Sequence, residues 1–219
     1  MTMKMKWLTI LAVLAVAVSG CGAASEQGNG GQGAAEPPAQ ESPTETTPPA
    51  EQPAEEPAEE LGVETGAEVE IETSIEGMSE KVKVTEYTLT PFGIRYVLRS
   101  VMGAPAVENG QVVYKSQMGD DVATIAVEAL AGVSLDEAVA EAQKRYADGY
   151  EAAELADIGI DLNGYPGKVQ GFQKGNYLYG FNAFDVDGTA VVIHSSYPQD
   201  AGDGMGAVLY ELIQSLKGE

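Results

Sequence analysis

The chain has 219 residues, of which 34 are acidic and 12 are basic, and its net charge at pH 7 is −22. This charge argues against nucleic acid as a partner, because few cations are available to neutralise phosphates. It also means that an anionic lipid surface would repel most of the chain. The charge is uneven, since residues 21–80 hold 15 glutamates and no Lys, Arg or Asp, whereas residues 81–219 hold 19 acidic and 10 basic residues.

The first 20 residues have the parts of an export signal. Lys4 and Lys6 precede a mainly apolar stretch over residues 7–18, and small residues follow it. Such a stretch rises only about 18 Å as a helix, too short to span a hydrocarbon core of about 30 Å. We therefore expect residues 1–20 to be a signal peptide rather than a transmembrane helix.

The four residues Val18-Ser19-Gly20-Cys21 resemble the lipobox of bacterial lipoproteins, although that motif most often starts with Leu. The resemblance implies cleavage between Gly20 and Cys21, and a diacylglycerol with further palmitate-type acylation at Cys21. Two or more acyl chains anchor a protein stably. We therefore expect lipidation at Cys21 and anchoring to the extracytoplasmic face of the bacterial cell membrane. The alternative is an ordinary secretory signal followed by an incidental cysteine.

Residues 21–66 have the composition of a linker. Glycines come first, seven prolines follow between residues 37 and 57, and Pro-Ala-Glu-Glu occurs twice over residues 53–60. Such a segment has too few apolar residues to offset the entropy of ordering, and its prolines and like charges extend it. We predict a disordered stalk. A spacer without a required length, or an acidic tract that itself binds a partner, are the alternatives.

Residues 67–219 have the composition of a single folded domain. Polar and apolar residues alternate over residues 68–72 and 81–85, which predicts strands. Further strands are expected over residues 94–98, 111–114 and 121–130. Ser134 and Glu137 form the capping box of a helix. The apolar face of that helix comprises Leu135, Ala138, Val139, Ala142 and Tyr146.

The second half of the domain predicts an antiparallel meander. Strands are expected over residues 168–173, 177–186 and 189–197, and Asp187-Gly188 is a typical hairpin turn. A helix over residues 201–217 follows. Its apolar stripe comprises Met205, Val208, Leu209, Leu212, Ile213 and Leu216. The predicted fold class is α+β, with a mainly antiparallel sheet and two principal helices packed on it.

Four short stretches in this order of elements resemble a known fold family. They are Ser134-Leu135-Asp136-Glu137, Asn163-Gly164-Tyr165-Pro166, Asp185-Val186-Asp187-Gly188 and Ser196-Tyr197-Pro198. Together with the two helices they resemble the PsbP-like fold. This fold is shared by an extrinsic subunit of photosystem II, a small Ran-binding protein and many bacterial lipoproteins. The resemblance implies an α/β/α sandwich over residues 68–217 and a role in binding partners. The shared stretches are turns and caps, so they bear on fold more than on activity.

His194, the only histidine, is the first candidate for catalysis. A general base needs an orienting carboxylate and a nearby nucleophile. Ser196 shares a strand face with His194, but the sequence shows no geometry for proton transfer, and a structural histidine is the alternative. We assign no catalytic residue. With one histidine and one cysteine, a typical zinc site is not expected either.

The segment 157–164 has oxygen-bearing side chains at alternate positions, as calcium loops do. Counted from Asp157, however, position 6 is Leu162 and position 12 is Lys168, where an EF-hand needs Gly and Glu. Alternating Ile158, Ile160 and Leu162 favour a strand, and we assign no metal site and no cofactor.

The start of the last helix combines acids with glycines. Asp200 and Asp203 suit the capping of that helix. The glycine-rich run 202–206 suggests phosphate binding, but aspartates accompany it and no lysine follows, so we do not expect a phosphate there.

Tyr177, Tyr179 and Phe181 share one face of a predicted strand. They form a binding platform if that face is open, and belong to the core if a helix covers it.

The sequence therefore predicts a non-enzymatic, lipid-anchored binding protein that engages a protein or a cell-envelope component. A small-ligand or metal-binding lipoprotein is the first alternative, and an unrecognised hydrolase is the second.

Overall fold

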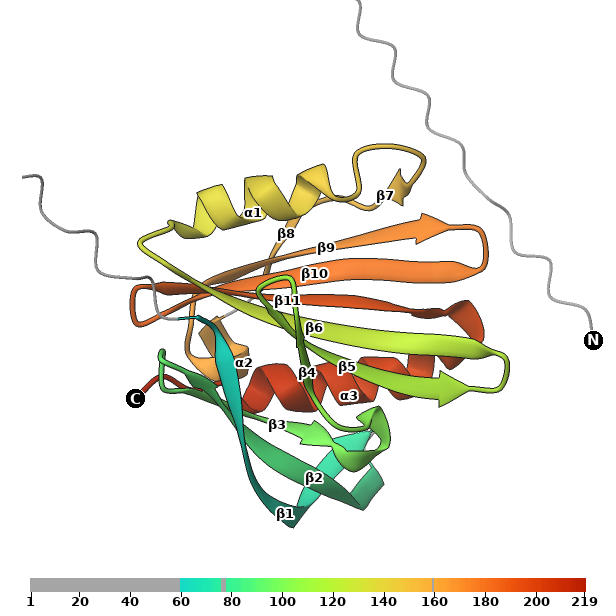
Figure 1. The fold of residues 1–219 in the computed structure, drawn as a ribbon. Coiled ribbons are helices and arrows are strands. Elements are labelled where there is room, and N and C mark those ends of the chain that lie inside the picture. Colours follow the sequence, from blue (N-terminus) through green and yellow to red (C-terminus); the bar gives the residue numbers. More distant parts are fainter. Residues whose placement is uncertain (1–59, 76–77, 159) are drawn as a thin grey trace, which may run out of the picture. The chain divides into compact units, whose positions relative to one another are not determined.

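The computed structural model describes residues 60–75, 78–158 and 160–219 (Figure 1). The predicted signal peptide, Cys21 and nearly all of the predicted linker lie outside the described residues. Within these ranges, no helix is both long enough and apolar enough to cross a membrane.

The chain first forms an antiparallel sheet of three strands: β1 (Gly62–Ile75), β2 (Met78–Thr90) and β3 (Ile94–Arg99). The strands predicted over residues 68–72, 81–85 and 94–98 are present and are longer than expected. Strand β1 begins at Gly62, five residues before the expected domain start at residue 67. Residues 62–65 have no clear alternation, and they are strand because their backbone pairs with residues 87–90 of β2.

A second, larger sheet has eight strands in the order β4-β5-β6-β11-β10-β9-β7, with β8 also paired to β9. All of its pairs are antiparallel. Its strands are β4 (Ala106–Glu108), β5 (Gln111–Met118), β6 (Asp121–Ala131), β7 (Glu151–Ala152), β8 (Ala156–Ile158), β9 (Gly167–Lys174), β10 (Tyr177–Val186) and β11 (Thr189–Pro198). Two strands were not predicted, β4 and β7, and they have three and two residues, too few to show a period.

The hairpin between β10 and β11 forms as predicted. Asp187 and Gly188 have φ angles of 51° and 88°, the left-handed backbone that a tight turn of this kind requires. The segment predicted as a strand through residues 158–162 differs, since β8 ends at Ile158 and a single helical turn, α2 (Ile160–Asn163), follows.

Two short 3-10 helices are present, η1 (Ser100–Met102) after β3 and η2 (Gln199–Ala201) after β11. Helix α3 (Gly202–Ser215) follows η2 directly and lies between the two sheets (Figure 1). Its buried apolar residues are Met205, Val208, Leu209, Leu212 and Ile213. They share one core cluster with residues of β2, β3, β5, β6, β10 and β11. The helix ends at Ser215, earlier than predicted, because Lys217 instead pairs with Arg95 of β3 in an isolated bridge.

Helix α1 (Leu135–Lys144) covers the opposite face of the large sheet (Figure 1). The predicted capping box forms between Ser134 and Glu137. Ala138, Val139 and Ala142 of α1 form a second core cluster with residues of β9, β10 and β11. Strand β11 contributes alternate residues to the two core clusters. Val191 and Ile193 belong to the cluster packed on α3, whereas Ala190 and Val192 belong to the cluster packed on α1. The predicted class is confirmed: α+β, mainly antiparallel, with two principal helices.

Candidate binding site around Tyr146 and His194

The structure separates the three predicted aromatic residues of β10. Phe181 is fully buried under α1 with Ala138 and Ala183, so it belongs to the core. Tyr177 and Tyr179 are half-buried, with ring centroids 6.0 Å apart. The Tyr177 hydroxyl donates to Asp121 Oδ1 at 2.9 Å, which ties the ring to β6. Of the three, only Tyr179 lines a hollow on the α1 side of the sheet.

This hollow has a volume of about 250 Å³. Its walls come from the residues just after α1 and from β6, β11 and β10. It is lined by Thr124, Ala126, Arg145, Tyr146, Tyr150, Tyr179, His194, Ser195 and Ser196. We call it the tyrosine hollow.

The tyrosines of the hollow hold each other edge to face. The ring centroid of Tyr150 lies 5.4 Å from that of Tyr146 and 5.0 Å from that of Tyr179. The rings in these two pairs are nearly perpendicular, with interplanar angles of 88° and 87°. Tyr146 also stacks on Phe172 of β9 at 4.4 Å. Such contacts are worth about 0.5–1.5 kcal/mol each beyond the area they bury. The rings are therefore positioned before any ligand arrives.

A polar network centred on the buried Glu128 and His194 adjoins the hollow. His194 Nε2 lies 3.0 Å from Glu128 Oε1, and His194 Nδ1 lies 3.2 Å from the Tyr146 hydroxyl. Glu128 Oε2 accepts hydrogen bonds from Arg145 Nη2 at 3.0 Å and from Gln111 Nε2 at 2.9 Å. The network arises because β6 and β11 pair so that Val192 lies opposite Glu128, which puts His194 one same-face position further along.

These contacts shift the pKa values of two members of the network. Burial by itself would raise the pKa of Glu128, but the hydrogen bond and charge of His194, then Arg145 and Gln111, hold it below its ordinary value. Burial raises the pKa of Tyr146 to about 12, against the opposing effect of the neighbouring Arg145 charge. At neutral pH, Glu128 is therefore an anion and Tyr146 keeps its proton.

Both ring nitrogens of His194 have partners, Glu128 and Tyr146, so neither is directed at Ser196. His194 and Ser196, which are predicted to share a face of the strand, both line the hollow, and Ser195 between them lines it too. The arrangement offers hydrogen-bond donors and acceptors, a cation and aromatic faces.

Sequence reasoning missed Glu128 and Tyr146 as partners of His194, and Arg145 as a partner of Glu128. A signal was present, because Glu128 interrupts the otherwise apolar run 125–131. A carboxylate in the interior of a strand needs a partner when it is buried, but the pattern does not say which one.

The other candidate residues lie apart from the hollow. The Asp157 carboxylate pairs with Lys168 Nζ at 2.6 Å, while Gly159 and the side chain of Asp161 are outside the described part. Asp200 lies in η2 and Asp203 in the first turn of α3. The expected side-chain cap does not form, because the N-cap position is Ala201. In the described ranges, no three His, Cys, Asp or Glu side chains are grouped to hold a metal ion.

No protein-family model matches this sequence, and a search of curated proteins finds no significant match.

Proposed function

We propose that this protein is a non-enzymatic, lipid-anchored binding protein on the extracytoplasmic face of the bacterial cell membrane. We further propose that it holds a cell-envelope partner in the tyrosine hollow. The observation that carries the proposal is the hollow itself, in which three preorganised tyrosine rings lie beside the buried Glu128–His194 pair and the exposed Arg145.

The envelope location rests on the N-terminal sequence. The lipobox-like Val18-Ser19-Gly20-Cys21 predicts the anchor, and the acidic, proline-rich residues 22–59 suit a stalk that keeps the domain away from an anionic surface. A helix on each face of an antiparallel sheet supports the proposed relationship to the PsbP-like fold.

The lining of the hollow favours a ligand with both apolar faces and many hydroxyl groups. Tyrosine rings offer flat apolar contact and a polar edge, while Arg145 and Ser196 supply polar groups beside them. The sugar rings of an envelope glycan have this chemistry. The volume of about 250 Å³ suits one or two such rings rather than a long segment of a folded protein.

A binding measurement tests this proposal. The soluble chain 22–219 is titrated with purified envelope glycan fragments, and Tyr150→Ala is compared with Tyr210→Ala. Tyr210 is an exposed tyrosine on α3, outside the tyrosine hollow, and serves as the matched control. We expect Tyr150→Ala to weaken binding at least tenfold and Tyr210→Ala to leave it unchanged. Equal binding by both variants, or no binding by the parent chain, would contradict the proposal.

A second experiment tests the anchor. Cells expressing the full chain or Cys21→Ser are fed labelled palmitate, and the protein is followed in membrane and medium. We expect label and membrane retention in the parent chain and loss of both in the variant. Label retained by Cys21→Ser would show that the anchor is elsewhere.

A free small ligand is the second candidate, favoured by the modest size of the hollow. Monosaccharides in the same titration distinguish the two candidates, because a receptor for a small ligand binds the monomer as tightly as the polymer fragment.

A further inference from the structure

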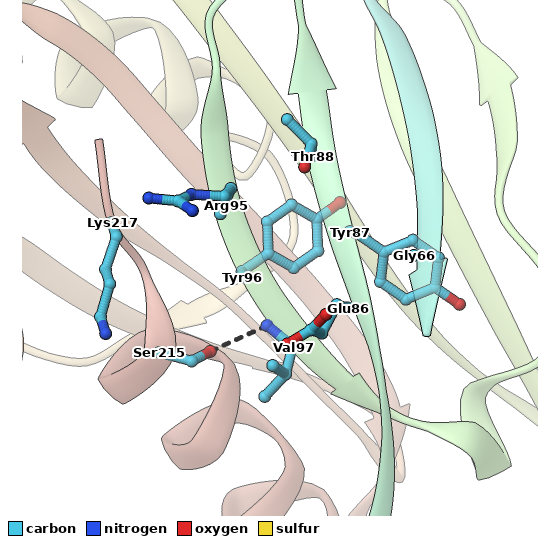
Figure 2. A pocket seen from close by; sticks show the side chains of 9 residues that line it. All are labelled: Gly66, Glu86, Tyr87, Thr88, Arg95, Tyr96, Val97, Ser215 and Lys217. Atoms are coloured by element: carbon cyan, nitrogen blue, oxygen red, sulfur yellow. Dashed lines mark hydrogen bonds between the residues drawn. The ribbon is translucent and has the colours of Figure 1, made fainter. Parts of the chain in front are cut away.

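A second cleft, on the other side of the molecule, is lined by two basic residues (Figure 2). It has a volume of about 310 Å³ and lies where the segment after α3 passes β3. Arg95 of β3 and Lys217 of the C-terminal segment stand next to one another along one side of it (Figure 2). None of its lining residues belongs to the tyrosine hollow.

The charges of the domain single out these two residues. The described residues include ten lysines and arginines. Those that pair with a carboxylate are Lys81, Lys83, Arg99, Lys115, Lys144, Arg145 and Lys168. The ammonium group of Lys174 lies 4.6 Å from the ring centroid of Tyr150. Among the described residues, only Arg95 and Lys217 have neither kind of partner, although acidic residues outnumber basic ones in this part of the chain.

The backbone holds Arg95 and Lys217 opposite one another. Arg95 N donates to Lys217 O at 2.8 Å, and Lys217 N donates to Arg95 O at 2.9 Å. This mutual exchange defines a directly opposed antiparallel pair, whose side chains leave the same face of the ladder. Like charges in such a pair destabilise the fold. An anion placed between them would turn this repulsion into attraction.

The nearest carboxylates leave the site cationic. Glu86 also lines the cleft, and the Glu219 side chain lies against Gly93, but neither forms an ion pair with Arg95 or Lys217. The Ser215 hydroxyl is already committed, since it accepts from Val97 N and donates to Leu212 O, both at 2.9 Å. Thr88 adds a hydroxyl to the lining.

We propose that this cleft binds a small oxyanion, a carboxylate or a phosphate group, between Arg95 and Lys217. The guanidinium group of Arg95 supplies the planar pair of N–H donors that such groups accept, and Lys217 supplies a point charge. The site is independent of the glycan proposed for the tyrosine hollow.

Calorimetric titration of the full lipidated chain, in uncharged detergent and chloride buffer, tests the proposal with inorganic phosphate and with succinate as separate probes. The variants are Arg95→Gln, Lys217→Gln and the double variant, with Lys115→Gln as control because Lys115 is a paired surface lysine. We expect saturable binding of at least one probe, weakened at least tenfold by each single cleft variant, lost in the double variant and unchanged in the control. Tighter binding of succinate would identify a carboxylate site, and tighter binding of phosphate a phosphate site.

Thermal unfolding without added anion provides a second readout. Removing one of two opposed cations relieves their repulsion, so Arg95→Gln and Lys217→Gln should unfold no lower than the parent chain. Phosphate or succinate should raise the unfolding temperature of the parent chain but not that of the double variant. The proposal is overturned if neither probe binds the parent chain, or if the double variant binds as the parent does.

Discussion

Arg99 of β3 and Glu211 of α3 form a two-point ion pair, with Nε 2.7 Å from Oε2 and Nη2 2.6 Å from Oε1. The Glu211 side chain is almost fully buried, at 2% exposure, and that of Arg99 is 18% exposed. The pair joins the small sheet to α3. Arg99 accordingly has a raised pKa, chiefly because of its hydrogen bonds to Glu211.

This pair predicts an asymmetric response to substitution. Arg99→Leu leaves the Glu211 carboxylate buried without its cation, and loss of one partner of such a pair costs about 3–5 kcal/mol. We expect Arg99→Leu to be destabilised by that amount in urea unfolding. The double variant Arg99→Leu/Glu211→Leu should recover a large part of the loss, because no charge is then buried. A double variant as unstable as the single one would contradict this account.

The Glu128–His194 pair predicts a dependence of stability on pH. The pKa of Glu128 is lower in the folded chain than its ordinary value, so the ionised form stabilises the fold. That contribution is fully present above the unfolded pKa, about 4.3, and is lost as the pH falls through the lowered folded pKa.

We therefore expect Glu128→Gln to cost about 1–3 kcal/mol at pH 7. The difference from the parent chain should shrink as the pH falls through the lowered folded pKa of Glu128, because below that pKa both chains carry an uncharged side chain at this position. Urea unfolding over a series of decreasing pH values measures it, and Glu64→Gln is the control because Glu64 is exposed. A difference that stayed constant with pH would show that Glu128 acts through shape rather than charge.

Two buried tyrosines near the small sheet provide a third prediction. The hydroxyl groups of Tyr96 and Tyr114 lie 2.7 Å apart, and both side chains are almost fully buried. Tyr96→Phe should cost about 1–3 kcal/mol, because the Tyr114 hydroxyl is left without its partner. The double variant Tyr96→Phe/Tyr114→Phe should cost less than the sum of the two single variants. Additive losses in this double-mutant cycle would mean that the hydroxyls do not depend on each other.

Two glycines should respond to alanine in opposite directions. Gly206 is exposed within α3, and a methyl group there meets nothing within 4 Å. Gly206→Ala should therefore stabilise the chain by about 0.5–1 kcal/mol, through the better helix propensity of alanine. Gly188→Ala should destabilise the chain, although Gly188 also has open space around it, because its φ of +88° is a backbone conformation that alanine rarely adopts. Thermal unfolding measures both, and shifts of the same sign would contradict this prediction.

Signals within a few residues of the chain predicted several elements well. The capping box of Ser134 and Glu137 located the start of α1, and Asp187-Gly188 located the β10–β11 turn. Both depend on local backbone geometry, so neighbouring residues suffice to specify them. The short strands β4 and β7 escaped prediction because each exists only through pairing with a neighbour in the sheet.

The candidate sites were harder to predict for a related reason. The tyrosine hollow combines residues from β6, the segment after α1, β10 and β11. Glu128 and His194 are 66 residues apart in sequence, and the opposition of Arg95 and Lys217 depends on one bridge after α3. Such contacts between distant segments follow from sheet order, which periodicity does not encode.

The sequence alone determined the local pattern: which residues alternate along a strand, where helices start and turn, and how charge divides between the first 80 residues and the rest. It also placed Tyr177, Tyr179 and Phe181 on one face. Only the tertiary structure decided that Phe181 is covered by α1 and that Tyr179 remains beside the hollow. The physical reason is that alternation determines which side chains share a face, whereas the packing of a distant helix decides how much of that face it removes from water.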